Sequence, residues 1–327
     1  MERQRRQSHW WIVGLLHVLG LTGFVYAALG EPAFWGLGLL AYSFGLRHAF
    51  DADHIAAIDN AVRKLVSGRS DSRGVGLYFS LGHSSVVLLM VLAIGLTADT
   101  YIFDNAALRE AGALIGTSVS GLFLVVIGCV NLVVLLRALS GARRSGWRDA
   151  DHAARPAGPL AALLRPVLRL VSRSWHMYPL GFLFGLGFDT ATEIGLLALS
   201  AGAASQSASL IGILSLPLLF ASGMTLLDTL DGMLMSRAYR WSSVSPGKKL
   251  AYNLTVTGVS VVSALFVGLL QLSHLLEDRL PHAWLAWTDR IDFVYLGCGL
   301  VGLFALTWIG FATIRRGVRH SHAVDGA

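Results

Sequence analysis

The chain has 327 residues, of which 54% are hydrophobic and only 14% are charged, and 36 of them are glycine. Such a composition is typical of an integral membrane protein and excludes an ordinary soluble domain with a large core. The formal net charge of +6 invites a nucleic-acid-binding interpretation, which the placement of the basic residues then contradicts. Cys129 and Cys298 both lie in apolar runs, so neither a disulfide framework nor a cysteine zinc site is expected.

Eight long apolar segments follow one another along the chain, and each has at least the ~20 residues that a helix needs to cross a bilayer. They run approximately over residues 10–30, 33–62, 74–98, 111–139, 176–202, 207–236, 250–275 and 291–314. A basic stretch, Met1–Gln7, precedes the first segment, which has no clear small-residue cleavage site. We therefore expect a first spanning helix there and not a removed signal peptide.

A long polar connection at about residues 140–175 separates the fourth apolar segment from the fifth. It contains three prolines and no pattern typical of a globular domain, so we interpret it as a cytoplasmic linker. The sequence thus predicts an all-α integral membrane protein with eight transmembrane helices. The predicted organisation is a single polytopic domain over residues 1–327, with helices 1–4 at about 10–139 and helices 5–8 at about 176–314.

Lysine and arginine residues set the predicted orientation, because they accumulate on the cytoplasmic side of membrane proteins. With the N-terminus in the cytoplasm, Arg109, Arg279 and Arg290 are the only ones of the 26 basic residues on the outer side, and Arg47 lies within a helix. We therefore expect both termini in the cytoplasm of a protein of the cytoplasmic membrane. The basic character then reflects membrane topology, and no nucleic-acid partner is expected.

The second apolar segment contains an unusual concentration of polar side chains between Arg47 and Ile55. They are Arg47, His48, Asp51, Asp53 and His54. Each charged side chain near the middle of a membrane costs at least ~2.5–3.5 kcal/mol, so this group must be compensated by a partner. Imidazole and carboxylate together are a natural ligand set for a divalent transition metal.

Helical geometry leaves two alternatives for these residues. At ~100° per residue, His48, Asp53 and His54 point in three different directions from an unbroken helix. Either they serve different partners, or the helix unwinds locally and brings them together. Broken helices are tolerated at membrane depth only where they line a cavity, which is typically a binding site.

Further embedded polar residues lie in the third, fifth and sixth segments. They are His83 in the third, Asp189, Thr192 and Glu193 in the fifth, and Asp228 and Asp231 in the sixth. Asp189 and Glu193 are four residues apart, and Asp228 and Asp231 three apart, so each pair shares one helix face. The embedded carboxylates far outnumber the one embedded arginine, Arg47. They must therefore be protonated, hydrated or paired with a cation, which favours cation transport.

Structural roles remain the alternative for single residues. An embedded histidine such as His17, or His83 alone, is more often an interhelical hydrogen-bonding residue than a ligand, and Asn131 is expected to join two helices. Arg47 either neutralises carboxylates such as that of Asp51 or acts in gating.

The remaining acidic residues have similar alternatives. Asp59 is expected at the membrane interface near the end of the second helix. The two aspartates of the sixth segment could instead cap their helix or pair with Arg237.

A short internal echo accompanies these residues. Phe50-Asp51-Ala52 in the second segment resembles Phe188-Asp189-Thr190 in the fifth, and each is preceded by a Gly-Leu pair. The two segments run in opposite directions through the membrane, so a genuine echo would be an inverted repeat with the site between its halves. Chance similarity explains the echo equally well.

With these blocks assembled, the chain resembles the nickel/cobalt transporter (NiCoT) family of single-component permeases over nearly its whole length. The most specific element is the His-x4-Asp-His box of His48, Asp53 and His54, and the Leu-Gly-His-Ser, Leu-Gly-Phe-Asp-Thr-Ala-Thr-Glu and Gly-Met-x3-Asp-Thr-x-Asp-Gly blocks follow in order. The resemblance implies high-affinity uptake of Ni²⁺ or Co²⁺. It implies metal-related roles for His48, Asp51, Asp53, His54, His83, Asp189, Glu193, Asp228 and Asp231.

The expected function is a secondary permease that takes a divalent metal ion as its substrate and carries no prosthetic group. The chain has no Gly-x4-Gly-Lys-Ser/Thr motif, so no ATPase is built in, and nothing implies a separate ATPase subunit. A membrane metalloprotease is disfavoured because His-Glu-x-x-His is absent. An exporter of similar fold and a different integral-membrane metalloenzyme are the remaining alternatives.

Overall fold

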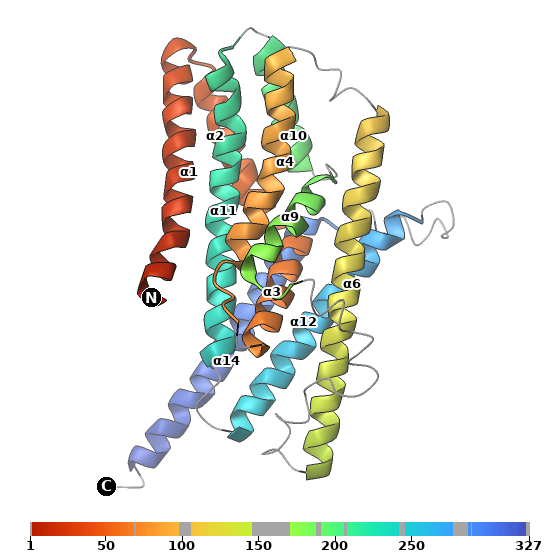
Figure 1. Cartoon of the computed structure of the whole chain (residues 1–327). Helices are drawn as coiled ribbons and strands as arrows, with labels where there is room; N and C mark the ends of the chain where they lie inside the picture. Colours follow the sequence, from red (N-terminus) through yellow and green to blue (C-terminus); the bar gives the residue numbers. More distant parts are fainter. Residues whose placement is uncertain are drawn as a thin grey trace.

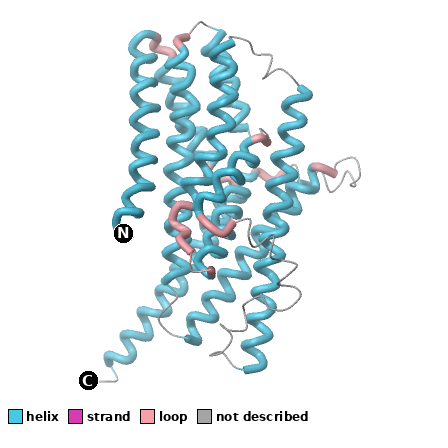
Figure 2. The backbone as a smooth tube through the Cα atoms, in the orientation of Figure 1, coloured by secondary structure: helices cyan, strands magenta, loops and turns pink. Residues whose placement is uncertain are grey.

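The computed structural model of this chain describes residues 2–68, 70–97, 106–145, 171–187, 191–205, 208–241, 246–276, 287–288 and 290–324. All regular secondary structure in these ranges is helical (Figures 1 and 2). The elements are α1 (Glu2–Gly30), α2 (Phe34–His48), α3 (Ala52–Ser67), α4 (Val75–Thr97), α6 (Ala106–Ser145), η1 (Ser174–His176), α9 (Met177–Gly185), α10 (Ala191–Ser205), α11 (Leu210–Trp241), α12 (Pro246–His274) and α14 (Phe293–Val324).

Five of these helices are long and apolar enough to cross a membrane. The apolar stretches are His9–Gly30, Val75–Leu96, Glu110–Gly141, Leu210–Tyr239 and Leu254–His274. They coincide with the first, third, fourth, sixth and seventh predicted segments. The eighth segment is also a helix, but its apolar part, Phe293–Thr307, is shorter than the apolar stretches of these five helices. The count of eight spans and the cytoplasmic position of both termini stay predictions.

The second and fifth predicted segments are each split into two helices, so the expectation of one continuous helix is wrong for the fifth. The second is interrupted between His48 and Ala52, and the fifth between Gly185 and Ala191. For the second segment, local unwinding is therefore the correct one of the two alternatives. The first copy of the internal echo, Phe50–Ala52, falls at the interruption in the second segment. The second copy, Phe188–Thr190, lies outside the described residues.

The interruption in the second segment is a turn followed by a new helix start. The amides of Phe50 and Asp51 donate to the carbonyls of Arg47 and His48, over 3.0 and 2.9 Å, instead of continuing the α-helical pattern. Asp51 then takes an extended conformation (φ −63°, ψ 138°) and stands at the N-cap of α3. The local backbone groups thus keep partners although the helix is broken, as burial requires.

Glycines let other helices cover this turn. Gly297 of α14 lies against the carbonyl of Phe50, and Gly45 of α2 lies against the carbonyl of Phe220 in α11. At both positions an added Cβ would overlap the facing carbonyl oxygen. Small residues that allow close backbone approach are the usual means of helix packing in membranes.

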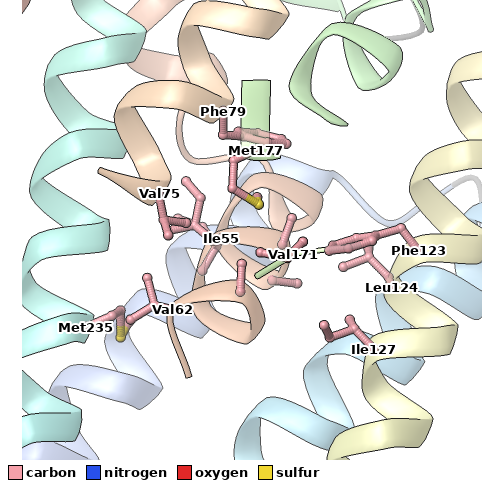
Figure 3. Packing of buried hydrophobic residues seen from close by; sticks show 14 of the residues in the cluster. Ile55, Val62, Val75, Phe79, Phe123, Leu124, Ile127, Val171, Met177 and Met235 are labelled. Carbon is pink, nitrogen blue, oxygen red and sulfur yellow. The ribbon is translucent and has the colours of Figure 1, made fainter. Parts of the chain in front are cut away.

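Helix α11 is the central element of the bundle, since it packs against α1, α2, α3 and α4 (Figure 1). A buried apolar cluster surrounds α3, where Ile55 meets Phe79 of α4 and Met177 of α9 (Figure 3). Large apolar side chains such as Trp11 and Leu306 are instead 77% and 69% exposed, as expected for a surface that faces lipid.

We expect Gly297→Ala to destabilise the protein, because the new methyl group would overlap the Phe50 carbonyl at the turn. Overpacking of this kind costs about 1–3 kcal/mol. The matched control is Gly299→Ala on the same helix, where an added Cβ meets nothing within 4 Å. Thermal unfolding of the purified protein in detergent should give a lower Tm for the first variant alone, and equal Tm values would contradict this account of the turn.

Candidate metal site

Three buried histidines from three helices form a compact cluster. His48 ends α2, His54 lies in the first turn of α3, and His83 lies in the middle of α4, with exposures of 1%, 0% and 3%. Their ring centroids lie 4.6 to 4.9 Å apart, and one nitrogen of each ring lies within 4.8 Å of the others. The turn between α2 and α3 makes this possible, because an unbroken helix would aim His48 and His54 apart.

Glu193 of α10 completes one side of this histidine cluster. The Nε2 atoms of His48 and His83 are 2.9 Å apart, and Glu193 Oε1 lies 2.7 Å from His83 Nε2 and 4.0 Å from His48 Nε2. Glu193 is itself only 1% exposed. Two imidazole nitrogens and a carboxylate oxygen thus converge on one small region, which is a suitable donor set for a divalent transition metal.

Other polar groups contact the remaining ring nitrogen of His48. Its Nδ1 lies 2.6 Å from Asp51 Oδ2 and 3.1 Å from Thr192 Oγ1. Hydrogen bonding of the second nitrogen to a carboxylate fixes the orientation of an imidazole and the nitrogen left to act as a ligand. Asp51 therefore contacts the ring nitrogen of His48 that is not the one near His83 and Glu193. Phe220 packs against the same ring, with 5.5 Å between the ring centroids.

His54 has a less complete set of partners. Its Nδ1 lies 3.4 Å from Asp228 Oδ2, and neither ring nitrogen has a hydrogen bond within the described part of the chain. Both carboxylate oxygens of Asp228 also lack one. A buried polar group left without a hydrogen bond costs about 1–3 kcal/mol. A ligand that contacts these two side chains would therefore recover stability that the protein alone does not have.

The carboxylate of Asp53 is directed to a different helix from the histidines. Its Oδ1 accepts the backbone N–H of His54 at 2.9 Å, and its Oδ2 accepts Gln271 Nε2 of α12 at 3.1 Å. Of the His48, Asp53 and His54 box, the structure therefore brings the two histidines together and adds His83 as their third neighbour.

A cavity of about 360 Å³ adjoins the histidine cluster. Its lining includes Asp51, Asp53, Thr192 and Gln271, and two of these, Asp51 and Thr192, also contact His48. The cavity therefore reaches the edge of the cluster.

Arg47 and Asp292 form an ion pair in the lining of this cavity. Their closest nitrogen and oxygen atoms are 3.6 Å apart, and the side chains are 51% and 40% exposed, which places them at its mouth. Arg47 thus neutralises a carboxylate, as one of the two alternatives predicted, but the partner is Asp292 and not Asp51, because the end of α2 directs the guanidinium towards Asp292 while Asp51 turns back to His48. A gating role of Arg47 stays a prediction.

The middle of α3 holds a second buried polar group around Asp59. Tyr239 of α11 donates a hydrogen bond to Asp59 Oδ1, and Arg63 donates to Tyr239 at 2.6 Å, to Thr257 at 2.7 Å and to the Val256 carbonyl at 2.9 Å. Asp59 is fully buried. The predicted position of Asp59 at a helix end is therefore wrong, because it lies in the middle of α3, where α11 and α12 cover it. Its depth in the membrane stays a prediction.

The comparisons with known proteins settle the family. The family model described as a high-affinity nickel-transport protein, NicO, matches residues 34–314. The chain belongs to the NicO family. Because this is a family of transporters and not of enzymes, the metalloenzyme alternative is excluded.

Among the relatives, the chain is 50% identical to the nickel transporter NixA of Staphylococcus aureus over 91% of this chain and 90% of that protein. It is 42% identical to the high-affinity nickel-transport protein NixA of Helicobacter pylori, covering 90% and 92% of the two chains. It is 40% identical to the cobalt transport protein NhlF of Rhodococcus rhodochrous, covering 94% and 92%. No solved structure matches the chain.

The remaining residues singled out in this NicO-family sequence take several positions. Asp189 lies outside the described residues. Asp231 lies one turn beyond Asp228 on α11, with its Oδ2 buried and without a hydrogen bond in the described ranges. Its pairing with Arg237 therefore stays untested.

Two expectations of interhelical hydrogen bonding are confirmed. Asn131 Nδ2 donates to Asn60 Oδ1 at 2.6 Å, which joins α6 to α3. His17 has Nδ1 at 2.8 Å from the Val13 carbonyl and Nε2 at 3.4 Å from the Tyr42 hydroxyl, which joins α1 to α2.

Sequence reasoning missed several residues next to the site. Three of them are polar residues within an apolar segment or near its end, namely Gln271, Ser120 and Asp292. A fourth, Arg63, lies in a stretch that the sequence presents as a basic loop. A single polar residue in such a place is an ordinary feature of membrane helices. The available signal was only the presence of Gln271 and Ser120 within otherwise apolar runs.

We expect Ni²⁺ to raise the Tm of the purified protein in detergent, because a ligand that binds only the folded state stabilises it by mass action, by about 2.7 kcal/mol at a hundredfold excess over Kd. His83→Ala should weaken the affinity behind this shift at least about tenfold, since it removes one of three converging imidazoles. His17→Ala is the control, because that imidazole bonds only within α1 and to α2. A shift that persists undiminished in His83→Ala would argue against metal binding at the cluster.

Proposed function

We propose that this chain takes up Ni²⁺ and Co²⁺ across the cytoplasmic membrane as a single-component secondary permease. The observation that carries the proposal is the buried cluster of His48, His54 and His83 with Glu193, which adjoins a cavity at a broken helix. Relatives named for nickel transport and for cobalt transport support both ions as substrates.

The predicted orientation places the cavity on the outer side. Helix α12 runs in the same direction as α1, and α14 runs in the opposite direction (Figure 1). The end of α12 and the start of α14, which both border the cavity, then face outwards when the N-terminus is cytoplasmic. An entering cation meets Asp51 and Asp53 first and the imidazoles afterwards.

The histidine cluster would be the place where the ion loses its water. Because the three rings are almost fully buried and less than 5 Å apart, a bound ion must exchange water molecules for imidazole and carboxylate ligands. Asp228 next to His54, and Asp231 one turn further along α11, would receive the ion on the inner side.

The driving force needs no ATPase. An inside-negative membrane potential contributes ~2.3 kcal/mol per charge per 100 mV, and therefore twice as much for a divalent ion. That amount is sufficient for accumulation against a concentration gradient of a thousandfold, at ~1.4 kcal/mol per factor of ten.

The test is accumulation of radiolabelled Ni²⁺ and Co²⁺ in cells that express the intact chain, His48→Ala or Asp53→Asn at equal levels. The intact chain should accumulate metal, and each substitution should lower the initial rate at least tenfold, because one removes a converging imidazole and the other a charge that lines the entry cavity.

His17→Ala is the control for general effects of removing a membrane histidine and should keep the rate of the intact chain. No accumulation by the inserted intact chain would refute the proposal. Metal content below that of control cells would point instead to an exporter.

A further inference from the structure

A buried glutamine links the entry cavity to the helix that begins at the turn. Gln271 of α12 is only 5% exposed and lines the cavity beside Asp53. Its Nε2 donates to Asp53 Oδ2 at 3.1 Å, and its Oε1 accepts the hydroxyl of Ser120 in α6 at 2.6 Å. Three helices are therefore joined through one amide group.

The chemistry of the partners determines how this amide is oriented. A carboxylate oxygen only accepts hydrogen bonds, so the NH₂ group of Gln271 must face Asp53. The carbonyl oxygen then faces Ser120. The hydroxyl of Ser120 lies 2.6 Å from this oxygen and 3.5 Å from Asp53 Oδ2, so its single proton goes to the nearer acceptor, Gln271. With Oδ1 of Asp53 held by the His54 amide, both oxygens of this carboxylate are fixed in place.

The cavity has the size for an ion that still carries water. A water molecule occupies about 30 Å³ of liquid, so six of them need about 180 Å³, roughly half of the cavity of about 360 Å³. In the histidine cluster, by contrast, the ring centroids lie only 4.6 to 4.9 Å apart. An arriving ion thus meets Asp53 while hydrated and loses its water afterwards.

We propose that Gln271, supported by Ser120, is a positioning residue that holds Asp53 in the wall of the cavity for the incoming hydrated cation. This inference rests on the proposed function. A neutral amide suits the task, because it orients the carboxylate without adding a second negative charge 3.1 Å away that would hold the ion in the cavity.

The test is the initial rate of radiolabelled Ni²⁺ uptake as a function of Ni²⁺ concentration. Gln271→Leu keeps the approximate size of the side chain and removes its hydrogen bonds. We expect the half-saturating concentration to rise about tenfold or more, since hydrogen bonds to a charged group are the stronger ones, while the maximal rate stays within about twofold. Ser120→Ala should raise it about threefold, because it loosens the amide without removing it.

The matched control is Ser273→Ala on the same helix. Ser273 is also buried, but its hydroxyl donates only to the Leu270 carbonyl of its own helix, so neither kinetic constant should change. Equal amounts of inserted protein and equal Tm values exclude a folding defect, and Ser120→Ala keeps the test open if Gln271→Leu does not insert.

An unchanged half-saturating concentration in both variants would overturn the inference while leaving the proposed function intact. A fall in the maximal rate alone would also overturn it, because that result indicates a general packing role. If the intact chain takes up no Ni²⁺, the proposed function and this inference fall together.

Discussion

The interruption of the second membrane segment between His48 and Ala52 is the feature on which the rest of the site depends. A regular helix cannot direct His48 and His54 to one point, and the turn does so by restarting the helix at Asp51. The break costs little free energy within the bundle because its amides donate to carbonyl oxygens and because Gly297 lets α14 pack directly over it.

Two kinds of buried polar group on α3 show how structure and function are divided. Asn60 donates to the Ala56 carbonyl at 2.8 Å and accepts from Asn131 at 2.6 Å, so it is satisfied and holds helices together. His54, less than two turns away, has no hydrogen bond on either ring nitrogen among the described residues. The first arrangement stabilises the bundle, and the second costs stability that a bound cation would restore.

The proposed route follows a gradient of water access. Partly exposed groups such as Arg47 and Asp292 stand at the mouth of the cavity, Asp53 and Gln271 line its wall, and the imidazoles lie fully buried behind it. Because electrostatic attraction grows stronger as water is excluded, the proposed route has an ion bind weakly at the entrance and tightly at the cluster.

The sequence by itself determined the membrane class, the five long apolar helices and the residue types able to bind a metal, because these depend on composition and on runs of apolar residues. It also indicated the family, since four blocks of residues match the motifs of nickel/cobalt transporters in the same order along the chain. Helical periodicity places Asp228 and Asp231 on one face, and that inference needs only the spacing within a helix.

Only the tertiary structure decided which of these groups meet. His83 contacts Glu193 across 110 residues of sequence, and Gln271 contacts Asp53 across 218. Periodicity does not tell how one helix is rotated against another, so the pairing of Arg47 with Asp292 and the burial of Asp59 were not predictable. The physical reason is that such contacts arise from the packing of helices far apart in the sequence, such as α4 against α10 and α3 against α12, which no local pattern encodes.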